Sequence, residues 1–241
     1  SILSFNPYAA GVDANTALAV EKVASQVMTT VKTIAAAAEG SGANAEDAAN
    51  QAFDSIVTVL QSKASSSETL NFANTTDLTS VKTQAKSKLA SLSGIDTTSF
   101  NTTLDTAMDS VKLVNDVINN ITDTDLTSNA NKGVFAAADH LKTQTKTAAT
   151  AEKATPGSGN QHITMNDADA VNSAVNSATS NAAPTDISLS KTSIAENSSS
   201  LTFTATTTDD NSSSFTYSLS GSDASYFTLN SSTGVLTLKA S

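Results

Sequence analysis

The sequence predicts an α+β protein of two parts, an N-terminal antiparallel helical bundle followed by an antiparallel sheet of the kind that builds a β-sandwich. Three observations predict this division. Apolar residues recur every three or four positions from residue 13 to about residue 150, the spacing of one helix face. After residue 184 they recur at every second position, the spacing of one face of a strand. A stretch of Gly, Pro, Ser and Asn at 155–160 lies between the two patterns.

The first two predicted helices span about 13–38 and 44–64. Asp13 is the expected N-cap of the first helix, and Gly40 with Gly42 is expected to end it. The apolar stripes that define the two helices are Val20, Val23, Val27, Val31, Ile34 and Ala38 in the first, and Ala45, Ala49, Ala52, Ile56 and Leu60 in the second.

Three further helices are predicted after a Ser-rich break. The third begins at its expected N-cap Asp77 and ends at Gly94, the fourth spans about 99–121, and the fifth spans about 127–150. Five amphipathic helices joined by short polar links predict an antiparallel bundle over 1–154. Their stripes are Leu78, Val81, Ala85, Leu89 and Leu92; Phe100, Leu104, Met108, Val111, Val114, Ile118 and Ile121; and Val134, Ala138, Leu141, Thr145 and Ala148.

Residues 155–183 are predicted to link the bundle to a β domain at 184–241. Within the linker, 166–179 has apolar residues at helical spacing, but so polar a helix needs another surface on which to dock. The alternating apolar residues that predict strands are Ile187 and Leu189; Leu201, Phe203 and Ala205; Phe215, Tyr217 and Leu219; and Val235, Leu236 and Leu238 after a turn at Thr233 and Gly234.

The composition excludes several function classes. The net charge is −10, and all 13 basic residues are Lys. Phosphate binding needs clustered Lys and Arg, so nucleic acid is not an expected partner. The chain has no Cys, which excludes disulfides, Cys-based metal sites and thiol catalysis. No stretch approaches the roughly 18 apolar residues of a membrane span, so no transmembrane segment is expected.

The C-terminal quarter carries four phrases in order: AAPTDISLS, SIAEN, TTTDDNSSSFTYSLSG and DASYFTLNSSTGVLTLKA. This order resembles the cadherin-like repeats of large bacterial surface and secreted proteins. The resemblance implies a cadherin-like, immunoglobulin-like β-sandwich at 184–241. The family's last two strands would lie beyond residue 241, so the sandwich is expected to be truncated. The resemblance does not extend to the first 180 residues.

The resemblance also implies a calcium site. In the family, the Glu of the AEN turn and the acidic residues of a D-x-D-x-D loop supply oxygen ligands, which suit Ca²⁺. Glu196 matches the first, Asp209 matches the start of the loop, and Asn211 stands at its second acidic position. Ser213 stands at the third. With so few carboxylates, we expect little calcium binding by this chain alone.

Other polar residues have simpler interpretations. Asp123 and Asp125 resemble the start of a calcium loop but lack its later Gly and Glu, so helix capping is expected for them. His140 and His162 lie 22 residues apart, with no acidic cluster at metal-ligand spacing. No P-loop, G-x-S-x-G or dinucleotide fingerprint occurs, and we expect no enzymatic activity.

These observations together favour a structural or adhesive segment of a large exported prokaryotic surface protein. Its expected role is adhesion, or assembly of a matrix or layer, outside the cell. The expected partners are other copies of itself or neighbouring domains of the same long chain. Two alternatives stay open: a filament or surface-layer subunit of flagellin type, and an accessory module of an exported hydrolase. The first would place matching helices at both chain ends, and the second would expose a patch of aromatic residues.

Overall fold

The computed structural model describes residues 6–9, 11–179, 186–191, 193, 201–208 and 215–239. The chain forms two compact units, Ser1–Thr179 and Ser180–Ser241. The first unit is helical and the second contains a small antiparallel sheet, as the change of apolar spacing predicts.

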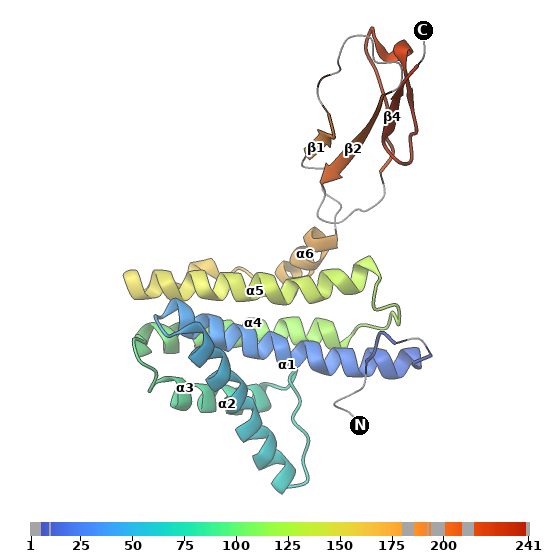
Figure 1. Ribbon diagram of the computed structural model, residues 1–241. Coiled ribbons are helices and arrows are strands. Elements are labelled where there is room, and N and C mark those ends of the chain that lie inside the picture. The colour runs from blue at the N-terminus through green and yellow to red at the C-terminus, as the bar shows by residue number, and fades with distance from the viewer. Residues whose placement is uncertain are drawn as a thin grey trace. The chain divides into compact units, whose positions relative to one another are not determined.

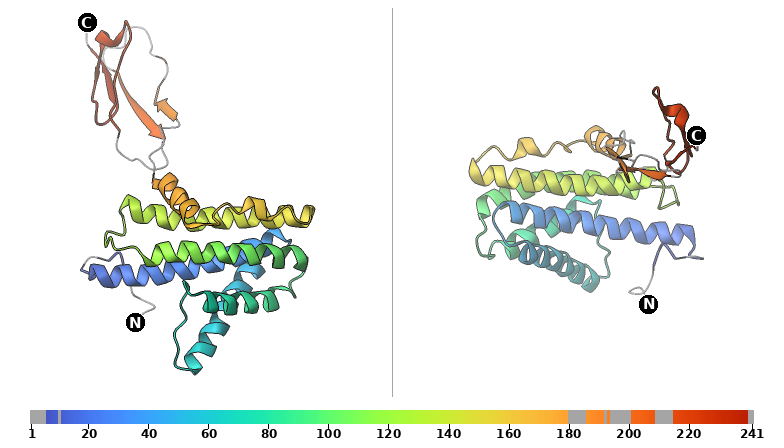
Figure 2. Two further views of the ribbon diagram at one scale, coloured as in Figure 1. Left: turned by 180° about the vertical axis from the view of Figure 1, so that it is seen from behind. Right: turned by 45° about the horizontal axis from the view of Figure 1, so that its top comes forward.

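Six α-helices form the described part of the first unit, and they confirm the predicted helical part. α1, α4 and α5 run side by side, α2 and α3 pack on one side of them, and α6 packs on α5 (Figures 1 and 2). Their bounds are α1 (Ala14–Gly40), α2 (Ala45–Ser65), α3 (Thr75–Leu89), α4 (Thr97–Asn119), α5 (Asn129–Ala154) and α6 (Ala168–Thr179), with a short 3₁₀ turn, η2 (Asn160–His162), before α6.

The helix directions follow from the cross-helix contacts. Lys32 pairs with Asp139 at 2.7 Å and Glu39 pairs with Lys146 at 2.8 Å, so the contacts advance along α1 and α5 together. These two helices are therefore parallel. On α4 the order is reversed, because Lys22 of α1 lies near the end of α4 and Ser41, just after α1, lies near its start. The antiparallel order expected for the bundle thus holds for α1 and α4, and α5 lies parallel to α1.

Side chains cap the N-terminus of each of the first five helices. Asp13 caps α1 as predicted, and its carboxylate accepts from the Thr16 N–H at 2.8 Å. The prediction of Asp77 as the cap of α3 was wrong, because Asn74 accepts the N–H bonds there. The full set of caps is Asp13, Asn44, Asn74, Asp96 and Ser128.

The predicted stripes of α1 and α2 are partly rotated from the buried faces. Val23 and Leu60 were expected in the core, and both are exposed. On α1 the core instead takes Gln26, Thr29 and Thr30. The two Thr hydroxyls donate to carbonyl oxygens four residues earlier, at 2.7 and 2.8 Å, so burial leaves neither donor unpaired. A pattern of apolar residues alone cannot identify such self-satisfied polar side chains as core.

A buried amide network ties α1, α4 and the loop before α3 together. Asn115 is fully buried, and its Nδ2 donates to the carbonyl oxygen of Phe72 at 2.8 Å. The Gln26 Nε2 donates to the carbonyl oxygen of Asn115 at 3.0 Å. These bonds join three segments far apart in the sequence, so the network fixes the relative register of the helices.

Small residues at 40–42 allow three elements to meet at one end of the unit. A Cβ at Gly40 would overlap the carbonyl oxygen of Lys146 and lie 2.7 Å from the Cβ of Ala149. The carbonyl oxygen of Ser41 accepts from the Asp96 N–H at 2.8 Å, just before α4. Gly42, at φ +109°, turns the chain away toward α2.

The segment expected to be a linker includes a docked part of the first unit. The buried carboxylate of Glu152 accepts from the N–H groups of Gly157 and Gly159, both at 2.9 Å, and so folds the loop back onto α5. Met165 and Val171 are buried beyond the loop. The first unit therefore extends to residue 179, and α6 has the packing surface that its polar sequence needs.

The second unit has a four-stranded sheet in the order β1-β2-β4-β3, with every pair antiparallel. The expected strand at Phe215–Leu219 is not assigned as a strand. In the described residues the sheet is a single layer, so the predicted sandwich is present only as this sheet. The strands are β1 (Asp186–Leu189), β2 (Thr202–Thr208), β3 (Phe227–Leu229) and β4 (Val235–Leu238), with a 3₁₀ turn, η3 (Ala224–Tyr226), before β3.

We predict that Gly40→Ala destabilises the first unit. The gain in helix propensity is about 1 kcal/mol, whereas overlap with the backbone of α5 costs about 1–3 kcal/mol or more, since a backbone carbonyl cannot rotate away. Urea unfolding should give a net loss of about 1–2 kcal/mol. Ser87→Ala, at an exposed position of α3, is the control and should be neutral or slightly stabilising. Equal stability of Gly40→Ala and the native chain would contradict the close packing.

Candidate functional site

The sheet of the second unit has one apolar and one polar face. Residues directly opposite each other in an antiparallel pair lie on the same face of the sheet. The pairing register therefore shows which side chains belong to each face. The polar face is mostly Thr and Ser, together with Asp186 and Val235. The apolar face, so named below, consists of Ile187, Leu189, Phe203, Ala205, Thr207, Phe227, Leu229, Leu236 and Leu238.

The apolar face is poorly covered. Phe203 is 5% exposed and is the one large hydrophobic side chain that is buried among the described residues of this unit. Its ring meets the ring of Phe227 edge to face, with centroids 6.5 Å apart. Ile187 and Leu189 on β1 are 62% and 48% exposed. A single layer of four short strands therefore leaves apolar area in water that a second layer would remove.

Residues 215–219 approach one end of the apolar face. The Thr207 hydroxyl donates to the Tyr217 hydroxyl oxygen at 3.2 Å, and the Tyr217 N–H donates to the Ser231 carbonyl oxygen at 2.8 Å. The rings of Phe215 and Tyr217 lie edge to face, with centroids 6.4 Å apart. This segment contacts the sheet at Thr207, but both Ile187, which lies opposite Thr207, and Leu189 on β1 stay exposed.

The chemistry of the apolar face is that of a binding surface. Its side chains are aliphatic and aromatic, with Thr207 as the polar exception, and none can transfer a proton near neutral pH. The unpaired edge of a sheet favours contact with another strand, and an exposed apolar face favours contact with another layer. This face is the candidate functional site of the second unit.

The predicted calcium ligands cannot be placed beside this face. Glu196, Asp209 and Asn211 all lie outside the described residues. Asp209 follows directly on β2, which ends at Thr208. In the rest of the chain, where side chains are described, no three His, Asp or Glu side chains gather into a group that could hold a metal ion.

The Asp pair at 123 and 125 shapes the turn that leads into α5. Asp123 accepts from the Asp125 N–H at 3.0 Å, and Asp125 accepts from the Thr127 N–H at 2.9 Å. Ser128 is the N-cap itself, so the capping prediction identified the right region but not the capping residue. His140 is exposed on α5, where its Nε2 lies 2.9 Å from the Gln144 side-chain amide, and His162 belongs to η2.

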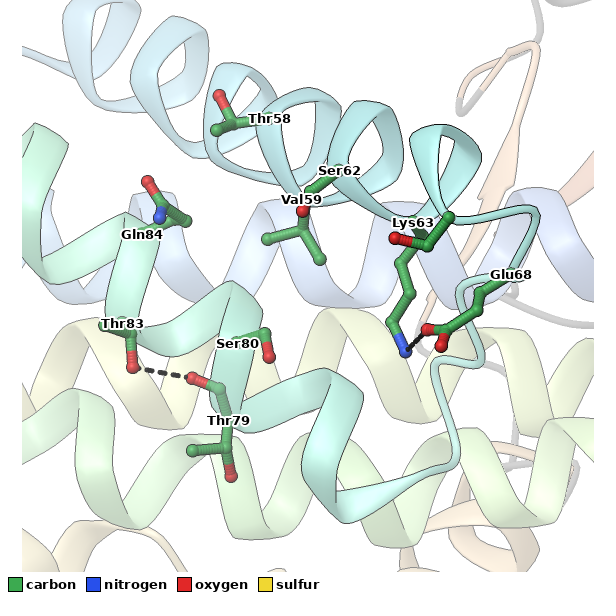
Figure 3. Close-up of a pocket in the computed structure, with 10 residues that line it drawn as sticks. Thr58, Val59, Ser62, Lys63, Glu68, Thr79, Ser80, Thr83 and Gln84 are labelled. Carbon is green, nitrogen blue, oxygen red and sulfur yellow. Dashed lines mark hydrogen bonds and ion pairs between the residues drawn. The ribbon is translucent and has the colours of Figure 1, made fainter.

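A groove of about 500 Å³ lies between α2 and α3 (Figure 3). Most of its lining is hydroxyl, and Lys63 stands at one end with Glu68. Several of these hydroxyls donate to carbonyl oxygens of their own helix, which leaves their oxygens as acceptors in the groove. The hydroxyl residues are Thr58, Ser62, Ser66, Thr79, Ser80 and Thr83.

Asp77 lies in this region and is the residue that the sequence pattern wrongly identified as the N-cap of α3. Its carboxylate is 8% exposed, pairs with Lys63 at 2.8 Å and accepts from the Asn71 N–H at 2.8 Å. The hydrogen bond from Lys63 lowers the pKa of Asp77 below its usual value, against the opposing effect of burial, and the Asn71 bond lowers it further. The pKa of Lys63 is raised, first by Asp77 and then by Glu68. Asp77 and Lys63 together hold the loop between α2 and α3 in place, which is a structural role.

No protein-family model, curated protein or solved structure matches this chain. None of the helices in the described ranges is long and apolar enough to cross a membrane.

We predict that the Asp77 pair makes stability fall in acid. The pKa of Asp77 is lower in the folded chain than in the unfolded chain. Its stabilisation is therefore complete above the unfolded value of about 3.9 and is lost as the pH falls below it. At pH 7, Asp77→Asn should lower the unfolding free energy by about 2 kcal/mol in urea titrations.

The difference between the native chain and Asp77→Asn should then shrink as the pH is lowered below about 4. Asp109→Asn removes an exposed carboxylate of α4 and serves as the control, with no such convergence expected. If the Asp77→Asn difference stayed constant down to pH 2.5, this pair would not be responsible.

Proposed function

We propose that this chain is a structural, non-enzymatic segment of an exported prokaryotic surface protein, in which a helical spacer precedes one half of a cadherin-like β-sandwich. The observation that carries the proposal is the uncovered apolar face of the sheet. Exposing such an apolar face to water is unfavourable in free energy for an isolated unit. A β-sandwich needs this kind of face, because its core forms between the apolar faces of two sheets.

The strand order supports the sandwich. In an immunoglobulin-type sandwich one sheet has the order A-B-E-D and the other contains C, F and G. The order β1-β2-β4-β3 fits A-B-E-D if residues 215–219 take the place of strand C between β2 and β3. That segment contacts the apolar face through Tyr217 and Thr207, on the side where the second sheet would lie. Three of the four phrases of the cadherin-like repeat contain residues of these elements, whereas 194–197 of the SIAEN phrase lie outside the described residues.

The proposed role is mechanical and adhesive. Strands that complete the second sheet would come from a neighbouring domain of the same long protein or from another copy. Either source links the helical unit to further units outside the cell, as adhesion or layer assembly requires. Antibodies raised against residues 14–179 should then label intact cells, and labelling only after cell lysis would argue against export.

We predict that chain extension covers the apolar face. The 241-residue chain should bind the dye ANS, and if its gene encodes further residues, a chain extended by about 60 of them should bind less. Hydrogen exchange should show greater protection of the β2 and β4 amides in the longer chain, because an added layer slows opening.

Leu189→Ser removes one exposed apolar side chain and should reduce ANS binding by the 241-residue chain. This reduction would show that the dye binds at the apolar face. Equal dye binding and equal protection in the short and extended chains would contradict the half-sandwich.

We also predict weak calcium dependence for this chain. If Glu196, Asp209 and Asn211 form part of a shared site, they supply only two carboxylates, and saturating Ca²⁺ should raise the melting temperature of the 241-residue chain by less than about 2 °C. If residues beyond 241 supply a further acidic motif, a chain that includes it should show a larger rise, which Glu196→Gln abolishes. A large rise in the 241-residue chain would show that its own ligands suffice.

A further inference from the structure

The helical unit carries a second apolar surface, on α2. This helix buries one face, which includes Ala52, Ile56 and Val59, against α1 and α3. A neighbouring face is also apolar but exposed: Phe53 is 52% exposed and Leu60 is 49% exposed. In Figure 1, α2 lies at the outer side of the first unit. The outer stripe of α2, as it is called below, consists of Ala49, Phe53, Val57, Leu60 and Ala64.

The outer stripe is continuous. Its members are spaced by four, four, three and four residues, so each lies next to the following one on the helix surface. With a rise of about 1.5 Å per residue, the stripe is about 22 Å long. That is the 3–4 spacing by which one helix packs along another.

The stripe is self-complementary when two copies run antiparallel. Its midpoint lies beside Val57, so an antiparallel second copy would set Ala49 beside Ala64 of that copy and Phe53 beside Leu60 of that copy. Large side chains then meet large ones at the centre, and small side chains meet at the ends. A parallel second copy would pair Phe53 with Phe53 and match side-chain sizes equally well, so size alone does not decide the direction.

The charges of α2 favour the antiparallel direction. The first turn is acidic, with Glu46 and Asp47, and the last turn is basic, with Lys63. Lys63 already pairs with Glu68 and Asp77, so its attraction for another carboxylate is small. Parallel copies, however, would place four carboxylates side by side, whereas antiparallel copies separate them and oppose the helix dipoles favourably.

We propose that two copies of this chain associate through a twofold, antiparallel pairing of their outer α2 stripes. The interface is isologous, with the symmetry axis beside Val57. One helix face is smaller than the standard interface of about 800 Å² per partner, so the pair is weak and its formation depends on concentration. The net charge of −10 opposes association, so added salt strengthens it. Many copies held together on a surface raise the effective concentration and make such a contact significant.

The absence of Cys from the chain allows a direct test of the geometry by oxidation of single-Cys variants of the full chain. Val57→Cys lies at the axis and should form a disulfide-linked dimer. Ala49→Cys alone should not, because the two Cys would lie about 22 Å apart, whereas a disulfide needs Cα atoms within about 7 Å. An equimolar mixture of Ala49→Cys and Ala64→Cys chains should link as the mixed dimer.

Sedimentation equilibrium from micromolar to millimolar concentration tests the affinity. Leu60→Glu should raise the dissociation constant at least about tenfold, because it places a charge at the centre of the stripe. Met28→Glu is the matched control: Met28 is exposed on α1, off the stripe, and its replacement should leave the dissociation constant unchanged. Circular dichroism of each variant confirms that the helices are intact.

Three outcomes would overturn the proposal. If the folded chain stays monomeric to millimolar concentration and Val57→Cys forms no cross-link, the stripe does not bind a second copy and would have to serve a different partner. Efficient self-linking of Ala49→Cys indicates parallel pairing. A dimer unaffected by Leu60→Glu associates elsewhere, for example through the apolar face of the sheet.

Discussion

The close approach of two helix backbones at Gly40 is the constraint on which the rest of the helical unit depends. Without a side chain there, the end of α1 lies against the carbonyl oxygen of Lys146 on α5. This contact sets the parallel register of the two helices, and the ion pair between Glu39 and Lys146 lies in that register. Immediately afterwards, Ser41 bonds both to the start of α4 and, through its hydroxyl at 2.7 Å, to Ser99. One short turn thus positions three of the six helices.

The core around this junction is built with few aromatic residues. The chain has no Trp, and its helical interior is mostly Ala, Val, Leu and Ile, joined by Thr and Ser. Small side chains let the helices approach closely. The hydroxyls at Thr29, Thr30 and Thr145 bond to carbonyl oxygens of their own helices, so they occupy core volume without unpaired donors. Solubility rests on the same residue types at the surface, since charged residues make up only 15% of the chain.

The two units leave apolar surface exposed in different ways. On the sheet, the apolar face is only partly covered, with Ile187 and Leu189 exposed, and the opposite face is mostly polar. On α2, the apolar arc is wider than the neighbours α1 and α3 can cover. Both surfaces suit contacts with further chain or further copies, which is the common physical basis of the assembly role proposed for this protein.

Local patterns in the amino-acid sequence were enough to predict the helices, the strands and the change between them. Period and capping signals are local, so the structure confirms the five predicted helices, a helix within the helically spaced stretch 166–179, and Asp13 as a cap. The alternating apolar residues of the sequence also indicated strands, and in the structure Leu189 and Phe203 lie on the same face of the sheet. The tertiary structure alone decided which face of each helix is buried, that Asp77 pairs with Lys63, and that Glu152 folds the loop after α5 back so that α6 can dock. These features depend on partners 5 to more than 100 residues away or on polar groups satisfied by their own backbone, and neither leaves a periodic signal in the sequence.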